Sequence, residues 1–132
     1  MINGGTRENH MKLFQFVAMA LIFSNPFAFA GEADVTQVEI KHTGDNTYYI
    51  EVTVRHDDEG WKHYADKWDV VAPDGTVLKT RTLYHPHVDE QPFTRSLSGV
   101  KVPASINAVT IQAHDSMHGY GGKTITVDIP HF

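Results

Sequence analysis

The chain has no cysteine among its 132 residues. This absence excludes disulfide bonds, thiolate metal ligands and cysteine nucleophiles, so any folded domain must be stabilised by packing alone. Basic residues are also few: 11 lysines and arginines stand against 16 aspartates and glutamates, and the formal net charge is −5. Nucleic acid is therefore not expected as a partner, because contacts to phosphates need a basic face.

No apolar run in the sequence is long enough to span a membrane. The run from Leu13 to Phe23 has about eleven residues, whereas a transmembrane helix needs about 20. It follows Met11-Lys12, and a helix breaker at Pro26 and an A-x-A sequence ending at Ala30 come after it. This order of a positively charged start, an apolar segment and a small-residue site is typical of a cleaved secretory signal.

The sequence therefore divides into three parts. We expect an upstream extension at residues 1–10, a signal peptide at 11–30 and one mature domain at 31–132 without a transmembrane span. Cleavage after Ala30 would place this domain in the periplasm or outside the cell.

The mature part consists of short β-prone segments separated by turn sequences, and no stretch has helical periodicity. Alternation is clearest at 47–55, where every second side chain is apolar. Turn residues at 43–46 and 73–75 suit hairpin connections. Seven strands are expected, at about 35–41, 47–55, 66–72, 76–83, 93–98, 107–113 and 123–129.

The same alternation predicts the core. Both tryptophans, Trp61 and Trp68, are expected to be buried as large apolar side chains. The other side chains expected to face inward are Ile50, Val52, Val54, Val70, Leu97, Val109, Ile111, Ile125 and Val127.

Two segments resemble parts of known β-sandwich domains. Residues 68–78, WDVVAPDGTVL, and 97–103, LSGVKVP, are similar to strand–turn segments of immunoglobulin and fibronectin-III domains. Residues 84–87, 90–97 and 114–122 also resemble small, histidine-rich secreted bacterial proteins of unknown function. These resemblances imply an all-β, seven-stranded immunoglobulin/fibronectin-III-like sandwich, and they bring no named activity.

Histidine is plentiful, with nine residues. If consecutive strands run up and down, three of the expected connections project from one end of the sandwich. These three connections contain six histidines: His56 and His63, His85 and His87, and His114 and His118. His42 and His131 would lie at the opposite end. Loops held by a rigid sandwich are common binding sites, so the histidine-bearing end is the candidate functional region.

Several histidines have spacings that suit metal ligation. An extended His85-Pro86-His87 segment places both imidazoles on one side, about 6.6 Å apart, although a proline-fixed corner with rings bonded to carbonyls is an equal alternative. His56 continues the inward phase of 47–55, so it is either a ligand or a buried histidine. The expected metal ligands are His85, His87, His114, His118 and His56, and the expected supporting or pocket residues are His63, Asp115, Glu90 and Tyr120.

Three functions fit these features. Imidazoles and carboxylates without thiolates favour a transition metal, copper or zinc. A metal-free module is the alternative, in which the same end of the sandwich binds a small ligand or another envelope protein. An enzyme is the weakest hypothesis, because neither G-x-S-x-G nor H-E-x-x-H occurs and no catalytic residue can be named.

Overall fold

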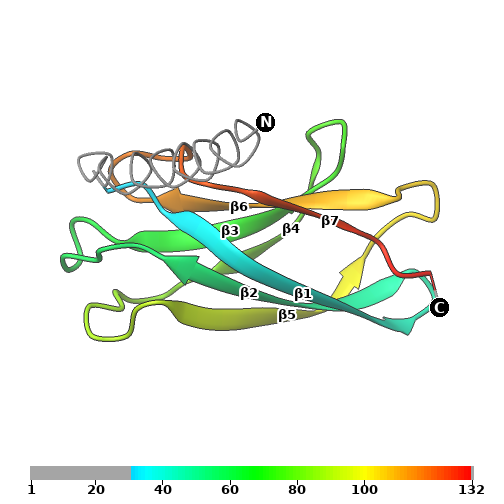
Figure 1. The fold of residues 1–132 in the computed structure, drawn as a ribbon, viewed down its shortest axis with the longest axis horizontal. Coiled ribbons are helices and arrows are strands. Elements are labelled where there is room, and N and C mark those ends of the chain that lie inside the picture. Colours follow the sequence, from blue (N-terminus) through cyan, green and yellow to red (C-terminus); the bar gives the residue numbers. More distant parts are fainter. Residues whose placement is uncertain (1–30, 132) are drawn as a thin grey trace, which may run out of the picture. The chain divides into compact units, whose positions relative to one another are not determined.

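The computed structural model describes residues 31–131, which form two antiparallel β-sheets (Figure 1). The predicted signal peptide and upstream extension lie outside these residues. Each of the seven expected strands has a counterpart. The strands are β1 (Asp34–Gly44), β2 (Thr47–Arg55), β3 (Ala65–Val71), β4 (Val77–Thr82), β5 (Phe93–Lys101), β6 (Ala108–Asp115) and β7 (Ile125–Asp128).

The two sheets have the strand orders β1-β2-β5 and β4-β3-β6-β7. A constant-type immunoglobulin domain pairs its fourth strand with its fifth. Here β4 instead pairs with β3, as in the fibronectin-III variant of the sandwich. The predicted all-β, seven-stranded sandwich is therefore confirmed. Residues 31–131 contain no helix of the length and apolar character that crossing a membrane requires.

The core lies between the sheets and follows the period-2 pattern of the strands. Trp68 on β3 is completely buried, at the third-strand position where immunoglobulin domains carry a core tryptophan. Most of the expected inward residues are buried, while Leu97, Ile125 and Val127 are half-buried against them. The prediction for Trp61 is wrong, because its side chain is 68% exposed and packs edge-on against Tyr64.

The strand β5 contains a β-bulge and continues to Lys101, beyond the predicted end at residue 98. Tyr48 and Ile50 of β2 pair with Val100 and Leu97 of β5, so β5 has one extra residue at this point. Gly99 takes a positive φ of 63° there, a conformation that glycine adopts without strain. Because of this extra residue, the side chain of Val100 points into the core, where it is fully buried.

The β2–β3, β4–β5 and β6–β7 connections lie at one end of the sandwich, together with the start of β1 (left in Figure 1). Hydrogen bonds join them: the backbone N–H of His87 donates to Asp58, and that of Ser116 donates to the carbonyl of Tyr64. The three histidine-bearing connections therefore meet, as the up-and-down path predicts.

Candidate metal centre

Two strands, one from each sheet, direct polar side chains into the end of the core. His56 follows β2 directly and keeps the inward phase of Ile50, Val52 and Val54, so its ring is buried. Asp115 is the last residue of β6 and is fully buried for the same reason. A polar pair thus replaces apolar packing where the sandwich ends.

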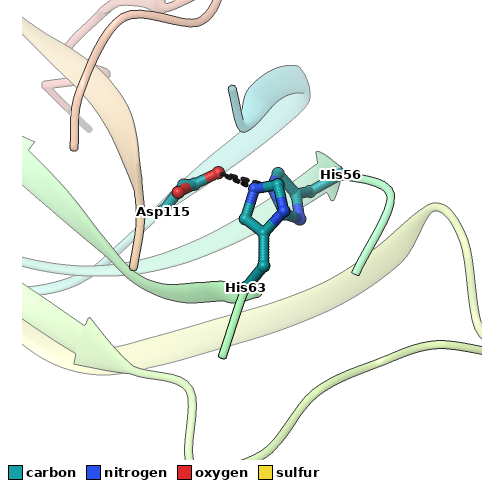
Figure 2. Close-up of side chains that lie close together, drawn as sticks. All are labelled: His56, His63 and Asp115. Carbon is teal, nitrogen blue, oxygen red and sulfur yellow. Dashed lines mark hydrogen bonds and ion pairs between the residues drawn. The ribbon is translucent and has the colours of Figure 1, made fainter. Parts of the chain in front are cut away.

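His63 joins this pair from the β2–β3 connection. Its backbone N–H donates to the carbonyl of Gly60, and its carbonyl accepts from the N–H of Glu59. This tight turn directs the ring toward Asp115. Figure 2 shows His56 and His63 close to the Asp115 carboxylate, and their two rings meet edge-on with centroids 4.9 Å apart.

The Asp115 carboxylate is the centre of the cluster. Its Oδ2 lies 2.6 Å from Nε2 of His56, 2.9 Å from Nε2 of His63 and 3.2 Å from Nδ1 of His118. Its Oδ1 accepts the backbone N–H groups of Met117 and His118, at 2.6 and 2.7 Å. One carboxylate oxygen therefore fixes the loop, while the other faces three imidazole nitrogens.

A second carboxylate lies behind each of the two buried rings. Nδ1 of His56 hydrogen-bonds Asp58, and Nδ1 of His63 lies 2.5 Å from Glu59. Asp58 is itself buried and accepts the backbone N–H groups of Ala65 and His87. The Nδ1 side of each ring is therefore held by a carboxylate, and the Nε2 side faces Asp115.

A backbone carbonyl completes the group. The carbonyl oxygen of Gly31 lies 2.7 Å from Nε2 of His56 and 3.3 Å from Nε2 of His63. Gly31 precedes β1, so the first described residue of the chain reaches the interior of the cluster. Nε2 of His56 and Nε2 of His63 therefore each face two oxygen atoms, the Gly31 carbonyl oxygen and Oδ2 of Asp115.

The carboxylates govern the charge of the cluster. Burial favours a neutral ring for His56, but hydrogen bonds to Asp58 and Asp115 overcome it and raise the pKa to about 9. Burial alone would raise the pKa of Asp115. Hydrogen bonds from backbone N–H groups and from histidines outweigh burial and hold this pKa well below its usual range. The hydrogen bond to Glu59 raises the pKa of His63. Without a metal, both ring nitrogens of His56 are therefore expected to carry a proton at neutral pH.

The arrangement can hold a metal ion with little rearrangement. One ligand atom each from His56, His63 and Asp115 lie within 4.8 Å of one another. Two ligand atoms about 2.1 Å from an ion at tetrahedral or octahedral angles are about 3.0–3.4 Å apart. The observed separations of 2.6 and 2.9 Å from Asp115 Oδ2 would need to grow by about 0.1–0.8 Å to reach this range. An ion would then replace the proton on Nε2 of His56.

The expected pair His85 and His87 lies outside this group. The two rings are close, with centroids 4.8 Å apart, but His87 stacks on Phe93 with centroids 4.0 Å apart. His87 is buried, and neither ring nitrogen has a hydrogen-bond partner within the described residues. Its Nδ1 lies 3.9 Å from Asp58, behind His56 rather than among the convergent atoms. His85 is exposed.

The other expected residues divide between the cluster and the surface. His118 lies at the cluster, whereas His114 points to the outer face of β6 and hydrogen-bonds Asp66 at 2.6 Å. Tyr120 packs edge-on against His114. Glu90 is exposed and pairs with Arg95 at 3.0 Å. Of the expected ligands, the cluster therefore contains His56 and His118, and it also contains the expected supporting residues His63 and Asp115.

Sequence reasoning gave too little weight to two members of this cluster. The alternation of Val109, Ile111 and Ala113 continues to Asp115, and that phase alone indicates an inward carboxylate. Gly31 gave no signal, because nothing in a sequence tells where the residues before a first strand will lie.

Comparison with known proteins gives one informative match. No family model matches the chain, and no solved structure matches it. The chain is similar to a protein from Halomicrobium mukohataei named "Putative lipoprotein", with 40% identity over 97 residues. The match covers 74% of this chain and 47% of the relative, so the chain spans about half the length of that curated relative.

Proposed function

We propose that the chain is an exported protein that binds one transition-metal ion, zinc or copper, through His56, His63 and Asp115. The observation that supports this most is the pair of carboxylates behind the rings. Asp58 and Glu59 accept hydrogen bonds at Nδ1, so each ring would keep its Nδ1 proton and offer Nε2 to an ion. Metal-binding histidines are usually oriented in this way, and the two Nε2 atoms here share one carboxylate oxygen.

The donor set favours particular ions. Imidazole and carboxylate ligands without thiolates suit zinc and Cu(II). Closed structural zinc sites have four protein side chains and are commonly cysteine-rich, whereas three side-chain ligands leave positions for other groups. His118 is placed to supply a further ligand, since its Nδ1 lies 3.2 Å from the shared oxygen. His85, His87 and His114 are outside the proposed coordination sphere.

Export is the second part of the proposal. The signal-like sequence of residues 11–30 supports it, and so does the name of the relative, because a lipoprotein belongs to the cell envelope. The periplasm or the extracellular space would then supply the metal.

The test is titration of Zn(II) and Cu(II) into untagged protein and two single variants. His63→Ala removes a proposed ligand that lies in the β2–β3 connection rather than in a strand, so the fold should be retained. His114→Ala is the matched control, because it removes an equally large ring from the opposite face of β6. We expect His63→Ala to weaken binding at least tenfold and His114→Ala to leave it unchanged. Equal affinity of all three proteins would contradict the ligand assignment.

A metal-free interaction module is the second candidate, and a separate observation favours it. Several large apolar side chains are exposed in the same three connections, among them Trp61, Tyr84 and Met117 at 68, 77 and 63%. Exposed apolar groups gathered on one surface often mark a binding site for another molecule. This candidate would replace the metal proposal if purified protein neither contains nor takes up an ion.

A further inference from the structure

The backbone of Gly31 is in close contact with the imidazole rings of the cluster. Besides the two contacts of its carbonyl oxygen, a Cβ atom at this position would lie 2.7 Å from Cε1 of His63 and 2.7 Å from Cε1 of His118. Only glycine fits here, and the reason is the closeness of the rings.

Gly31 is held in place by the chain that follows it. Ala33 is buried, and the N–H of Val35 donates to the carbonyl of Lys123 at 2.8 Å. In return, the N–H of Lys123 donates to the side chain of Asp34 at 2.7 Å. The β6–β7 connection therefore fixes residues 33–35, and this anchoring does not depend on any residue before Gly31.

We propose that Gly31 becomes the N-terminal residue of the exported protein and binds the metal through both its α-amino nitrogen and its carbonyl oxygen. This inference rests on the proposed metal site and on cleavage after Ala30. It adds two backbone ligands to the side chains of His56, His63 and Asp115, and it makes removal of the signal peptide a step in assembling the site.

The chemistry of the nitrogen explains why cleavage matters. Before cleavage the Gly31 nitrogen belongs to a peptide bond, whose lone pair is delocalised into the carbonyl and is a poor donor to a metal. Hydrolysis adds water across the Ala30–Gly31 bond, leaving a carboxylate on Ala30 and an α-ammonium group on Gly31. An α-amino group has a pKa of about 7.7–8.0, so it gives up one proton to an ion near neutral pH.

Geometry favours binding by both atoms of the residue. The nitrogen and the carbonyl oxygen of one residue are joined through only Cα and C, over bonds of about 1.2–1.5 Å. An ion bound to both closes a five-membered ring. Because the oxygen already lies 2.7 Å from Nε2 of His56, an ion that binds this oxygen and His56 is within reach of the amine as well.

The experiment compares two proteins exported from the full chain with its own leader, and a third protein serves as the control. One is the native sequence, and the other carries a serine inserted between Ala30 and Gly31, so that cleavage yields Ser-Gly31 and the nitrogen of Gly31 remains an amide. A serine added after Phe132 is the matched control. Zn(II) is the probe, because it does not readily displace an amide proton. N-terminal sequencing and the melting temperature verify cleavage and folding in each case.

We expect the inserted serine to weaken Zn(II) binding about tenfold or more and the C-terminal serine to have no effect. Equal affinity of all three proteins would overturn the role of the Gly31 amine and leave the side-chain site standing. Absence of Zn(II) binding in all three would overturn the proposed function together with this inference.

Discussion

The buried carboxylate of Asp58 hydrogen-bonds Nδ1 of His56, so the His56 ring presents Nε2 to Asp115 and to the Gly31 carbonyl. Two further hydrogen bonds, from the backbone N–H groups of Ala65 and His87, keep Asp58 in position. The carboxylate thereby holds the Nδ1 proton and sets the direction of the ring.

Asp58→Asn is therefore expected to weaken metal binding without removing a ligand. Loss of a carboxylate that orients a ligand histidine typically costs 10–100-fold in affinity. Competition titration with a chelator of known zinc affinity measures this change. Glu59→Gln is the matched control behind His63, and its effect should be smaller because the Glu59 side chain is exposed to solvent. An unchanged affinity for Asp58→Asn would contradict the orienting role.

The stability of the metal-free protein should depend on pH through His56. Its folded-state pKa of about 9 lies above the ordinary value of 6.5, so its contribution is fully present below pH 6.5 and is lost as the pH rises through about 9. The low pKa values of Asp58 and Asp115 act in the opposite direction: their contribution is present above about pH 3.8 and is lost as the pH falls below it.

Thermal unfolding in the presence of a chelator tests this dependence. The melting temperature should fall between pH 6.5 and 9.5, and saturating Zn(II) should reduce the fall, because the ion takes the place of the proton on Nε2 of His56. A metal-free protein that becomes more stable over this range would contradict the charge assigned to His56.

The two tryptophans should differ strongly in their contribution to stability. Trp68→Ala removes a completely buried side chain and should cost about 3–5 kcal/mol of unfolding free energy. Trp61→Ala removes an exposed one and should change the unfolding free energy by about 0.5 kcal/mol or less. Urea unfolding of both variants measures the difference, and similar costs would contradict the placement of Trp68 at the centre of the core.

Processing is expected after Ala30. The small residues of the A-x-A sequence suit signal peptidase. N-terminal sequencing of the exported product should begin at Gly31. A product that still contains Leu13 to Phe23 would contradict export with cleavage.

Most of the fold could be predicted because strand alternation is a local property. The phase of Ile50, Val52 and Val54 continues to His56, and it correctly indicates a buried ring. The same phase separates His114 from Asp115, since adjacent residues of a strand point to opposite faces. Trp61 was mispredicted because it lies in a connection, where no alternation fixes the direction of a side chain.

The site could be predicted only in part, because it depends on contacts between distant segments. The spacing of His85 and His87 does bring their rings together, but it cannot tell that His87 will stack on Phe93. Likewise, the place of Gly31 is set by β6–β7 residues about ninety positions away, such as Lys123.

Native mass spectrometry of the untagged, exported protein after incubation with Zn(II) or Cu(II) tests the metal site most directly. The proposed site predicts one retained ion per chain, and His63→Ala should lose it under conditions in which His114→Ala keeps it. A wild-type protein that retains no ion, or one that binds equally well without His63, would contradict a metal centre at His56, His63 and Asp115.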